Sequence, residues 1–176
     1  MRFDMCFHGP FAVATGQAGR GADSTVNAAQ LLPGRSLKGV MRAAAAQVVA
    51  PLRHDLVEQV FGTARQPSPW HWSSASFVDP RIRRRARTAI EEGTRTVADR
   101  TLRFAEEVWA RDATFTVEPL APADDPVLHT LVLKASAQAV QSLGMDRRRG
   151  LGWVTIQPDP PLTDEELDTL IRMVTT

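Results

Sequence analysis

The sequence predicts an α+β fold, in which strands and helices alternate along the chain. Short segments that alternate apolar and polar residues, such as residues 113–118, are typical of half-buried strands. Two longer segments differ, because residues 37–50 are rich in alanine and residues 127–143 repeat apolar side chains at helical spacing. The chain has 176 residues, 43% of them hydrophobic, so it can bury one sizeable core and is not a disordered protein.

The first predicted element is a strand over residues 2–14, which begins with apolar and polar residues in alternation. Residues 15–30 are rich in glycine and small polar groups, and this composition predicts a long loop. Long loops within compact domains are usually functional or mobile. This loop is therefore a candidate for function.

A helix is expected next, over residues 37–50. The proline and glycine at 33–34 predict a turn before it, and Ser36 is the expected N-terminal cap. Pro51 ends or interrupts this helix. Residues 55–62 predict a short second helix that is closed by its last residue, a glycine.

The middle of the chain is expected to be mostly extended. Residues 74–78 predict an extended segment, and residues 102–109 and 113–118 predict strands. Residues 81–101 are highly polar and have no apolar period, which predicts an exposed arm or hairpin.

The last third begins with the helix over residues 127–143. An arginine-rich glycine loop, LGMDRRRGLGWV, follows it and leads into a strand over residues 152–156. Thr163 and Glu166 have the spacing of a capping box, which predicts a final helix.

The order of these elements is βαββαβ, as in ferredoxin-like and RRM-like domains. We therefore expect a single domain over residues 1–176. An arm is inserted at residues 81–103, and a C-terminal helix is appended at residues 160–176.

The charge of the chain is nearly balanced but unevenly distributed. The formal net charge is +1, and only Lys38 and Lys134 among the 21 basic residues are lysines. The planar fork of arginine suits phosphate, although a GC-rich genome produces the same excess. The clusters RIRRRAR at 81–87 and RRR at 147–149 are the stronger observation, because neighbouring guanidiniums repel one another unless an anion lies nearby. They predict binding of a polyanion.

Several other classes of protein are not expected. Cys6 is the single cysteine, so no intrachain disulfide is possible, and no zinc-ligand spacing surrounds it. No apolar run approaches the ~20 residues of a membrane span. Asp4 and His8 stand where a signal peptide would be apolar. We expect a cytoplasmic protein with no membrane partner.

The start of the first helix is a candidate phosphate site. A helix N-terminus offers unpaired N–H groups and a partial positive charge. Lys38 adds a cation there, and Gly34 and Gly39 let the backbone approach a ligand. The alternative is an ordinary capped helix with solvated basic residues. In a βαββαβ fold this helix start and the last loop can lie close together, which would give one track for the phosphates of a polyanion.

The chain contains a proline-glycine turn followed by SLKG in LLPGRSLKGVMRAAAA, and a basic glycine-rich loop in LGMDRRRGLGWV. These segments resemble the RAMP superfamily (repeat-associated mysterious proteins) of CRISPR effector complexes. In that family a proline-glycine turn and an SLKG element open the first helix, and they are matched here by LLPGRSLKGVMRAAAA. The family's C-terminal glycine-rich loop is similar to LGMDRRRGLGWV. The repeated backbone subunit of type III complexes has N-terminal and middle segments similar to GADSTVNAAQLLPGRSLKG and IEEGTRTVADRTLRFAEEV. The resemblance spans about residues 2–156.

This resemblance implies a function and a set of site residues. Backbone subunits of the family form a filament along a guide RNA (crRNA), with copies of themselves and other CRISPR effector subunits, and cut the paired single-stranded target RNA. It implies that Asp23 is the catalytic residue and the ligand of Mg²⁺ or another divalent metal. Guide contacts are implied for Arg35, Ser36, Lys38, Gly39, Arg42, Arg147, Arg148, Arg149 and Gly150. A protruding thumb that kinks the guide is implied for the arm, with Arg83, Arg84, Arg85 and Arg87.

Two alternatives remain open within the same superfamily. A lone carboxylate in a glycine-rich loop can hold Mg²⁺ together with phosphate oxygens and waters, or orient the attacking 2′-hydroxyl, but it is also a common turn former. A non-catalytic scaffold that binds guide RNA and neighbouring subunits is therefore the first alternative. The second is a guide-processing endoribonuclease with His8 or His54 as general base, and the SLKG element argues against it.

Overall fold

The main sheet has the strand order of a ferredoxin-like domain, and the predicted α+β fold class is confirmed. The structure is a computed structural model that describes residues 1–19, 21–88, 90–93, 95–97 and 101–175. Strands run in the order β2-β6-β1-β7, each antiparallel to its neighbour, and β3 also pairs with β6. The bounds of these strands are β1 Arg2–Phe7, β2 Trp70–Trp72, β3 Ser76–Phe77, β6 Asp112–Pro119 and β7 Val154–Asp159.

The alternation along these strands decides which face of the sheet is buried. In β1 the side chains of Phe3, Met5 and Phe7 are buried, while Arg2 and Asp4 on the opposite face are exposed. β6 and β7 alternate in the same way. One face of the sheet therefore packs on the helices, and the other is polar and open.

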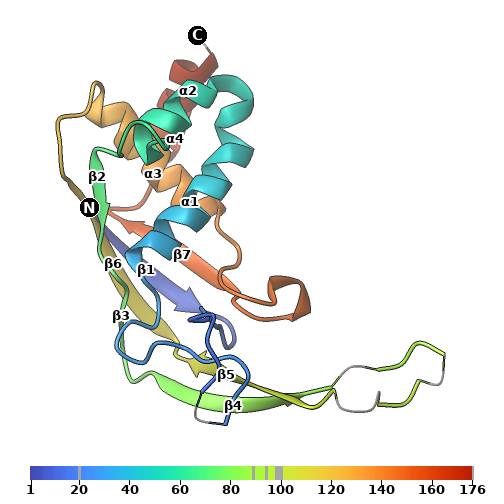
Figure 1. Ribbon diagram of the computed structural model, residues 1–176. Helices are drawn as coiled ribbons and strands as arrows, with labels where there is room; N and C mark the ends of the chain where they lie inside the picture. The colour runs from blue at the N-terminus through green and yellow to red at the C-terminus, as the bar shows by residue number, and fades with distance from the viewer. Residues whose placement is uncertain (20, 89, 94, 98–100, 176) are drawn as a thin grey trace.

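Four helices complete the core at one end of the molecule (Figure 1). Two of them, α1 and α3, pack on each other, and α3 also packs on β7. Their bounds are α1 Gly34–Val48, α2 Ala50–Phe61, α3 Pro126–Ala139 and α4 Asp164–Thr175.

The first helix begins earlier than predicted, and Ser36 is not its cap. The N-cap position belongs to Pro33, without a side-chain hydrogen bond, so Ser36 lies inside the helix. Gly34 is the first helical residue because its backbone passes against β2, where a Cβ would collide with the carbonyl oxygen of Trp72. The sequence contains this glycine but does not show what it approaches.

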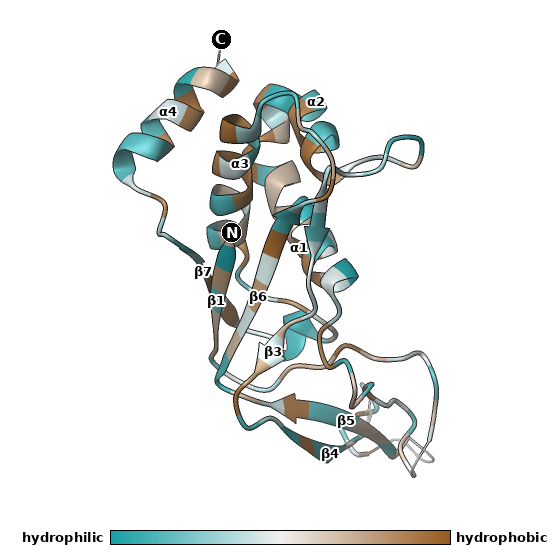
Figure 2. Cartoon of the chain, turned by 90° about the vertical axis from the view of Figure 1, so that its left-hand side faces the viewer, coloured by the Kyte–Doolittle hydropathy of each residue, from teal (hydrophilic) through white to brown (hydrophobic). Residues whose placement is uncertain are grey.

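The arginine-rich arm forms a β-hairpin, one of the two forms predicted for it. β4 (Arg81–Arg87) pairs with β5 (Arg103–Trp109) in an antiparallel two-stranded sheet. The hairpin projects from the end of the molecule opposite to the helices (Figures 1 and 2). Within the predicted arm at 81–103, residues 89, 94 and 98–100 lie outside the described residues, as does Thr176 at the end of the appended helix.

Other boundaries differ from the sequence-based expectation. β1 ends at Phe7, because the chain turns at Gly9 and Pro10 and Phe11 then pairs with Val108 of β5. The segment Trp70–Trp72 is an additional strand, on which Trp72 is buried and stacked on Phe61. Both differences arise because pairing partners far along the chain override local composition.

The C-terminal helix forms with its predicted capping box. Thr163 N–H donates to Glu166 Oε2 at 3.0 Å, and Glu166 N–H donates to Thr163 Oγ1 at 3.2 Å. The same carboxylate accepts from the buried Lys134 Nζ of α3 at 2.7 and 2.8 Å, which fixes α4 on the domain. Within the described parts of the chain, none of the helices has the length and apolarity needed to cross a bilayer.

Candidate nucleic-acid interface

The register of the hairpin separates its arginines onto two faces. Arg83 lies opposite Glu107, and Arg84 opposite Glu106. Because side chains alternate along a strand, Arg83, Arg85 and Arg87 share one face, while Arg84 lies on the other. The guanidinium of Arg83 also lies over the ring of Trp109, 5.4 Å from its centroid.

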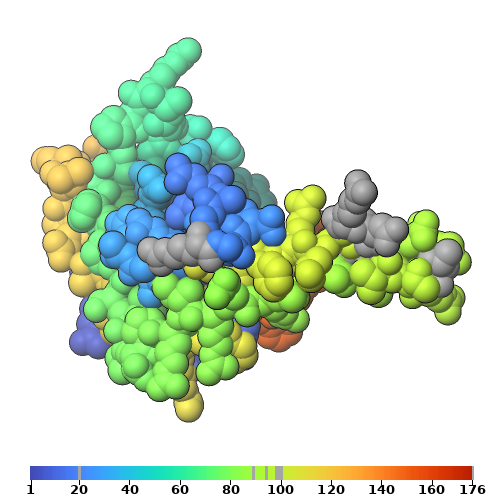
Figure 3. Space-filling view, turned by 60° about the horizontal axis from the view of Figure 1, so that its bottom comes forward, coloured from blue at the N-terminus to red at the C-terminus, as the bar shows by residue number. Residues whose placement is uncertain are grey.

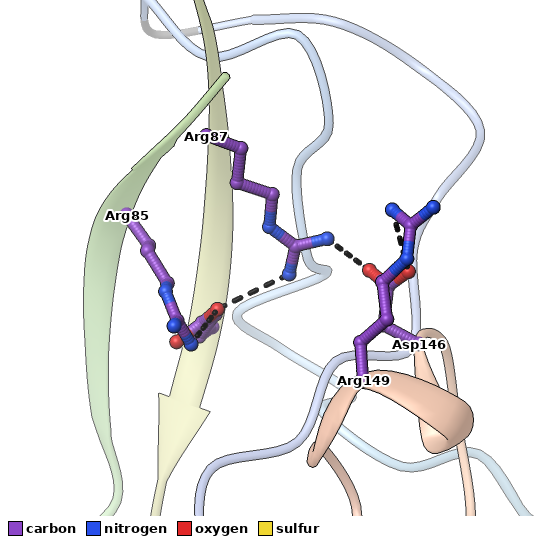
Figure 4. Close-up of polar contacts among 5 residues, drawn as sticks. Arg85, Arg87, Asp146 and Arg149 are labelled. Atoms are coloured by element: carbon purple, nitrogen blue, oxygen red, sulfur yellow. Dashed lines mark hydrogen bonds and ion pairs between the residues drawn. The ribbon is translucent and has the colours of Figure 1, made fainter. Parts of the chain in front are cut away.

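Two carboxylates organise the arginines on the first face (Figure 4). Glu107 is buried and accepts from Arg85 Nη1 at 3.5 Å and from Arg87 Nη2 at 3.2 Å. Arg87 also donates through Nη1 to Asp146, whose other oxygen lies 3.9 Å from Arg149 Nη1. Arg87 therefore bridges the hairpin and the arginine-rich loop, and the two clusters that are about 60 residues apart in sequence meet there.

The meeting point forms a continuous basic surface. One hollow of 480 Å³ is lined by hairpin residues, including Arg83 and Glu107, together with Arg149 of the loop. A second hollow of 580 Å³ is lined by Arg87, Asp146 and Arg149. We call this the arginine surface, and it comprises Arg83, Arg84, Arg85, Arg87, Arg147, Arg148 and Arg149 with Glu107 and Asp146.

The three arginines of the loop differ in whether they have a partner within the protein. Residues Arg147–Arg149 form a short 3-10 helix, and all three are exposed. Arg149 has the ion pair with Asp146, whereas among the described residues Arg147 and Arg148 have no hydrogen bond or ion pair. Arg147 and Arg148 are therefore free to take an external anion.

The glycines around this loop serve its own packing. Gly144 and Gly152 both have positive φ, and a Cβ on them would collide with the carbonyl oxygens of Ala12 and Leu143. A Cβ on Gly150 would meet nothing within 4 Å. Only Gly150 thus leaves open backbone next to the arginines, as the sequence-based hypothesis requires.

The basic residues of α1 form a separate group. Arg35 and Arg42 are exposed, and Lys38 lies between them along the helix, with Nζ 5.4 Å from the centroid of the Trp72 ring. The pKa of Lys38 is lowered, first by partial burial and next by the positive charge of Arg42. A Cβ on Gly39, on the exposed side of the helix, would meet nothing within 4 Å.

Contact between α1 and the arginine-rich loop runs through other residues of the helix. A hollow of 280 Å³ brings Arg147 together with Val40, Ala43 and Gln47 of α1. Helical geometry places these three on a different side from Arg35, Lys38 and Arg42. A phosphate backbone that runs from the start of α1 to the arginine-rich loop therefore has to pass over the middle of α1. The spacing of the residues in the sequence did not predict this path.

The glycine-rich loop places Asp23 beside the hairpin, along the edge of β5 that does not pair with β4. Asp23 is exposed, and its N–H donates to the carbonyl oxygen of Phe104 at 2.7 Å. Its Oδ2 accepts from Phe104 N–H at 2.8 Å. Glu106 holds the same loop further along by accepting from Val26 N–H at 3.0 Å. Figure 3 shows this N-terminal segment in blue beside the strands of the hairpin.

One carboxylate oxygen of Asp23, Oδ2, is thus fixed by a hydrogen bond, while the residue is exposed to solvent. Its Oδ2 accepts from the backbone of β5, far along the chain, so Asp23 holds the loop against the hairpin and does not act as the local turn former considered as the alternative to catalysis. A cation is close to the same loop, because a Cβ on Gly21 would lie 3.2 Å from Arg84 Nη1. The described residues contain no group of three or more His, Cys, Asp or Glu side chains that could hold a metal ion.

The two histidines considered for guide processing lie in different settings. His8 is exposed at the end of β1, with Nε2 2.7 Å from Thr155 Oγ1, and it lines a hollow together with Arg147. His54 is exposed on α2. The hollow beside His8 is also lined by Trp153. The sequence analysis did not propose Trp153 as a site residue, although it lies close to the three arginines in the sequence.

The organising carboxylates were also missed. Glu106 and Glu107 are adjacent in a strand, and Asp146 precedes the three arginines, so the only available signal was opposite charge near the clusters. Burial makes Glu106 and Glu107 important, because a buried carboxylate requires a partner, and Asp146 is half-buried where it meets Arg87.

Comparison with known proteins identifies the family. The sequence model of the RAMP superfamily matches residues 25–155. No curated protein matches the chain.

Two similar solved structures come from a type III-B Cmr-beta complex. A chain of its apo state has a TM-score of 0.68 and 12% identity, over 89% of this chain and 95% of that one. A chain of the complex bound to cognate target RNA has a TM-score of 0.69 and 11% identity, over 88% and 95%. At this identity the likeness concerns the fold. The family match itself covers well over half of the sequence, and the chain therefore belongs to the RAMP superfamily.

Proposed function

We propose that the chain is a backbone subunit of a type III CRISPR effector, which binds guide RNA through the arginine surface and cleaves the paired target RNA at Asp23. The observation that carries the proposal is the bridge made by Arg87. It joins the hairpin to the arginine-rich loop, so that two basic clusters act as one surface. The similar chains belong to structures of the Cmr-beta complex, one in the apo state and one with the complex bound to cognate target RNA, and they support the choice of assembly.

The arginine surface suits an RNA backbone in its chemistry. It has seven arginines against two carboxylates, and both carboxylates are engaged by arginines of the surface. The unengaged guanidiniums of Arg147 and Arg148 can each contact a phosphate. Lys38, Arg35 and Arg42 on α1 would extend the contact along the guide.

Asp23 is proposed as the residue that acts on the target strand. The two hydrogen bonds with Phe104 fix its backbone and Oδ2, so the carboxylate is held in one orientation at the surface. A divalent cation such as Mg²⁺ would need phosphate oxygens and waters among its ligands at this position, because the described residues offer no cluster of three or more His, Cys, Asp or Glu side chains to hold it. When bound, such an ion stabilises negative charge on a scissile phosphate. Asp23 itself would orient the 2′-hydroxyl that attacks it.

The experiment uses the ribonucleoprotein assembled in its host, with labelled complementary RNA and Mg²⁺. Asp23→Asn is the variant of choice, because an amide oxygen can still accept from Phe104 N–H and the loop keeps its position. We expect regularly spaced cuts from the wild type and a loss of at least about 100-fold in rate in the variant, with guide RNA retained. Asp168→Asn, an exposed acid on α4, is the matched control and should cut normally.

Other results select among the alternatives. Cuts unchanged in Asp23→Asn would move the chemistry to another residue or subunit. If neither protein cuts but both hold guide RNA, the chain is a non-catalytic scaffold. Cutting of guide precursor that persists in a chelator, and is lost in His8→Gln, would identify the processing enzyme, because a histidine base needs no metal.

A further inference from the structure

The hollow beside His8 borders the arginine surface and lies at the edge of the main sheet. Its volume is 740 Å³, within the range of small-molecule sites. It lies where the end of β1, the end of α3 and the start of β7 meet. Its lining residues are His8, Gln138, Val140, Gln141, Ser142, Arg147, Trp153, Val154 and Thr155.

Trp153 is the most unusual member of this lining. Its side chain is 60% exposed, although tryptophan is a large apolar residue. Its backbone is held on two sides, because Trp153 forms a bridge with Ser142 and its carbonyl oxygen accepts from His8 N–H at 2.9 Å. The indole ring therefore stands on a fixed backbone with a face available to a flat ligand.

The polar groups of the hollow favour a ligand that is anionic and accepts hydrogen bonds. Its lining includes Arg147 and no carboxylate. Gln138, Gln141 and Ser142 offer amide and hydroxyl groups. His8 is oriented by Thr155 through its Nε2 and presents the rest of its ring. A fixed aromatic ring, a free guanidinium and side-chain amides are the groups that bind single-stranded nucleic acid.

Arg147 also lies at the boundary between the two surfaces. It lines this hollow and the hollow that it shares with Arg148 and Arg149. A strand whose phosphates lie along the arginine surface would therefore reach the hollow without interruption. This continuity favours RNA over a protein segment as the occupant.

We propose that this hollow is a nucleotide-binding pocket, in which an unpaired RNA base stacks on Trp153 while Arg147 contacts its phosphate. The inference rests on the proposed RNA-binding function and adds to it a site that recognises a base. The base lies flat on the indole, and its edge faces Gln138 and Gln141.

The test compares two probes on the full chain by fluorescence anisotropy. One is labelled oligoadenylate of about 12 nucleotides, and the other is a ribose-phosphate chain of equal length without bases. Trp153→Ala should weaken oligoadenylate binding at least about 5-fold and leave the abasic chain unchanged. Trp153→Phe should retain most of the affinity, and Arg147→Gln should weaken both probes. Leu120→Ala, another exposed apolar residue, is the control.

Three results would overturn the pocket. The first is a Trp153→Ala variant with wild-type affinity for oligoadenylate. The second is a variant that loses affinity for both probes equally, because that would mark a general structural effect. The third is unchanged RNA binding with altered association between protein chains, which would assign Trp153 to a protein contact. If the wild type binds neither probe, the proposed RNA-binding function itself fails. This result differs from the three above, in which only the pocket fails.

Discussion

Glu107 and Asp146 divide the arginines around them into two kinds. Arg85 and Arg87 neutralise the buried Glu107, and Arg87 also bonds Asp146, so these side chains already have internal partners. Arg147 and Arg148 have exposed guanidiniums that no described residue engages. Substitutions at Arg87 should therefore affect the fold, whereas substitutions at Arg147 and Arg148 should affect binding of an external anion.

His129 is a second residue whose environment determines its behaviour. It is buried, its Nδ1 accepts from Trp70 Nε1 at 3.2 Å, and its Nε2 has no hydrogen-bond partner among the residues that the structure describes. Burial lowers the pKa of His129 below its ordinary value of 6.5, although the charges of Asp125 and Asp124 oppose this. The imidazole is thus neutral in the folded protein.

This lowered pKa predicts a loss of stability in mild acid. As the pH falls through about 6.5, the unfolded chain binds more protons at His129 than the folded chain does, so the free energy of unfolding falls with pH. Denaturant titrations at about pH 7.5 and pH 5.5 should show a smaller free energy of unfolding at the lower pH, and His129→Gln should abolish this loss. The exposed His71, replaced by glutamine, should leave the loss in place. An equal loss in His129→Gln would refute this assignment.

The hairpin is the element whose attachment decides the shape of the arginine surface. Two contacts hold its base, namely the bridge of Arg87 to Asp146 and the pairing of β5 with the N-terminal segment at Phe11 and Asp23. Beyond that base the hairpin extends away from the body (Figures 1 and 3). Its orientation should therefore depend on a few buried polar contacts near Glu107.

A pair of substitutions in β4 tests this dependence. Arg87→Gln leaves the carboxylate of Glu107 buried with a weaker partner, and it should lower the free energy of unfolding by roughly 1–3 kcal/mol. Arg81→Gln removes an ion pair with Asp79 in which both side chains are mostly exposed, and its effect should stay within about 0.5 kcal/mol. Urea unfolding of both variants measures the difference. Equal stability of the two variants would show that the bridge does not hold the hairpin.

The sequence could predict the elements whose signals are local. The capping box at Thr163 and Glu166, the polar hairpin, and the alternation in β6 all depend on residues close together, and all are found. The start of α1 at Gly34 and the short strand Trp70–Trp72 depend on partners far along the chain. Spacing in sequence contains no information on those partners, so these boundaries were misplaced.

At the scale of the whole molecule, charge is segregated although the net charge is only +1. The arginine surface lies at the hairpin end, while the acidic start of α4 (Asp164, Glu165 and Glu166) belongs to the helical end. The sequence predicted both arginine clusters as binding sites. It could not show that the clusters meet, or that Trp153 stands in a hollow beside Arg147, because both facts depend on how the last loop packs on residues 10–12. The sequence therefore predicted that a polyanion binds, and the fold shows which residues form the surface for it.

The most direct test of the central claim is the salt dependence of RNA binding by the full chain. Affinity for a single-stranded RNA should fall as salt is raised, and each phosphate contact contributes about 0.7 to the slope of log affinity against log salt. Replacing Arg147 and Arg148 together by glutamine should lower that slope by about 1.4. Arg65→Gln, an exposed arginine in the loop after α2, should not change it. A slope that stays at the wild-type value in the Arg147 and Arg148 double variant would contradict the account, since these guanidiniums would then not contact RNA.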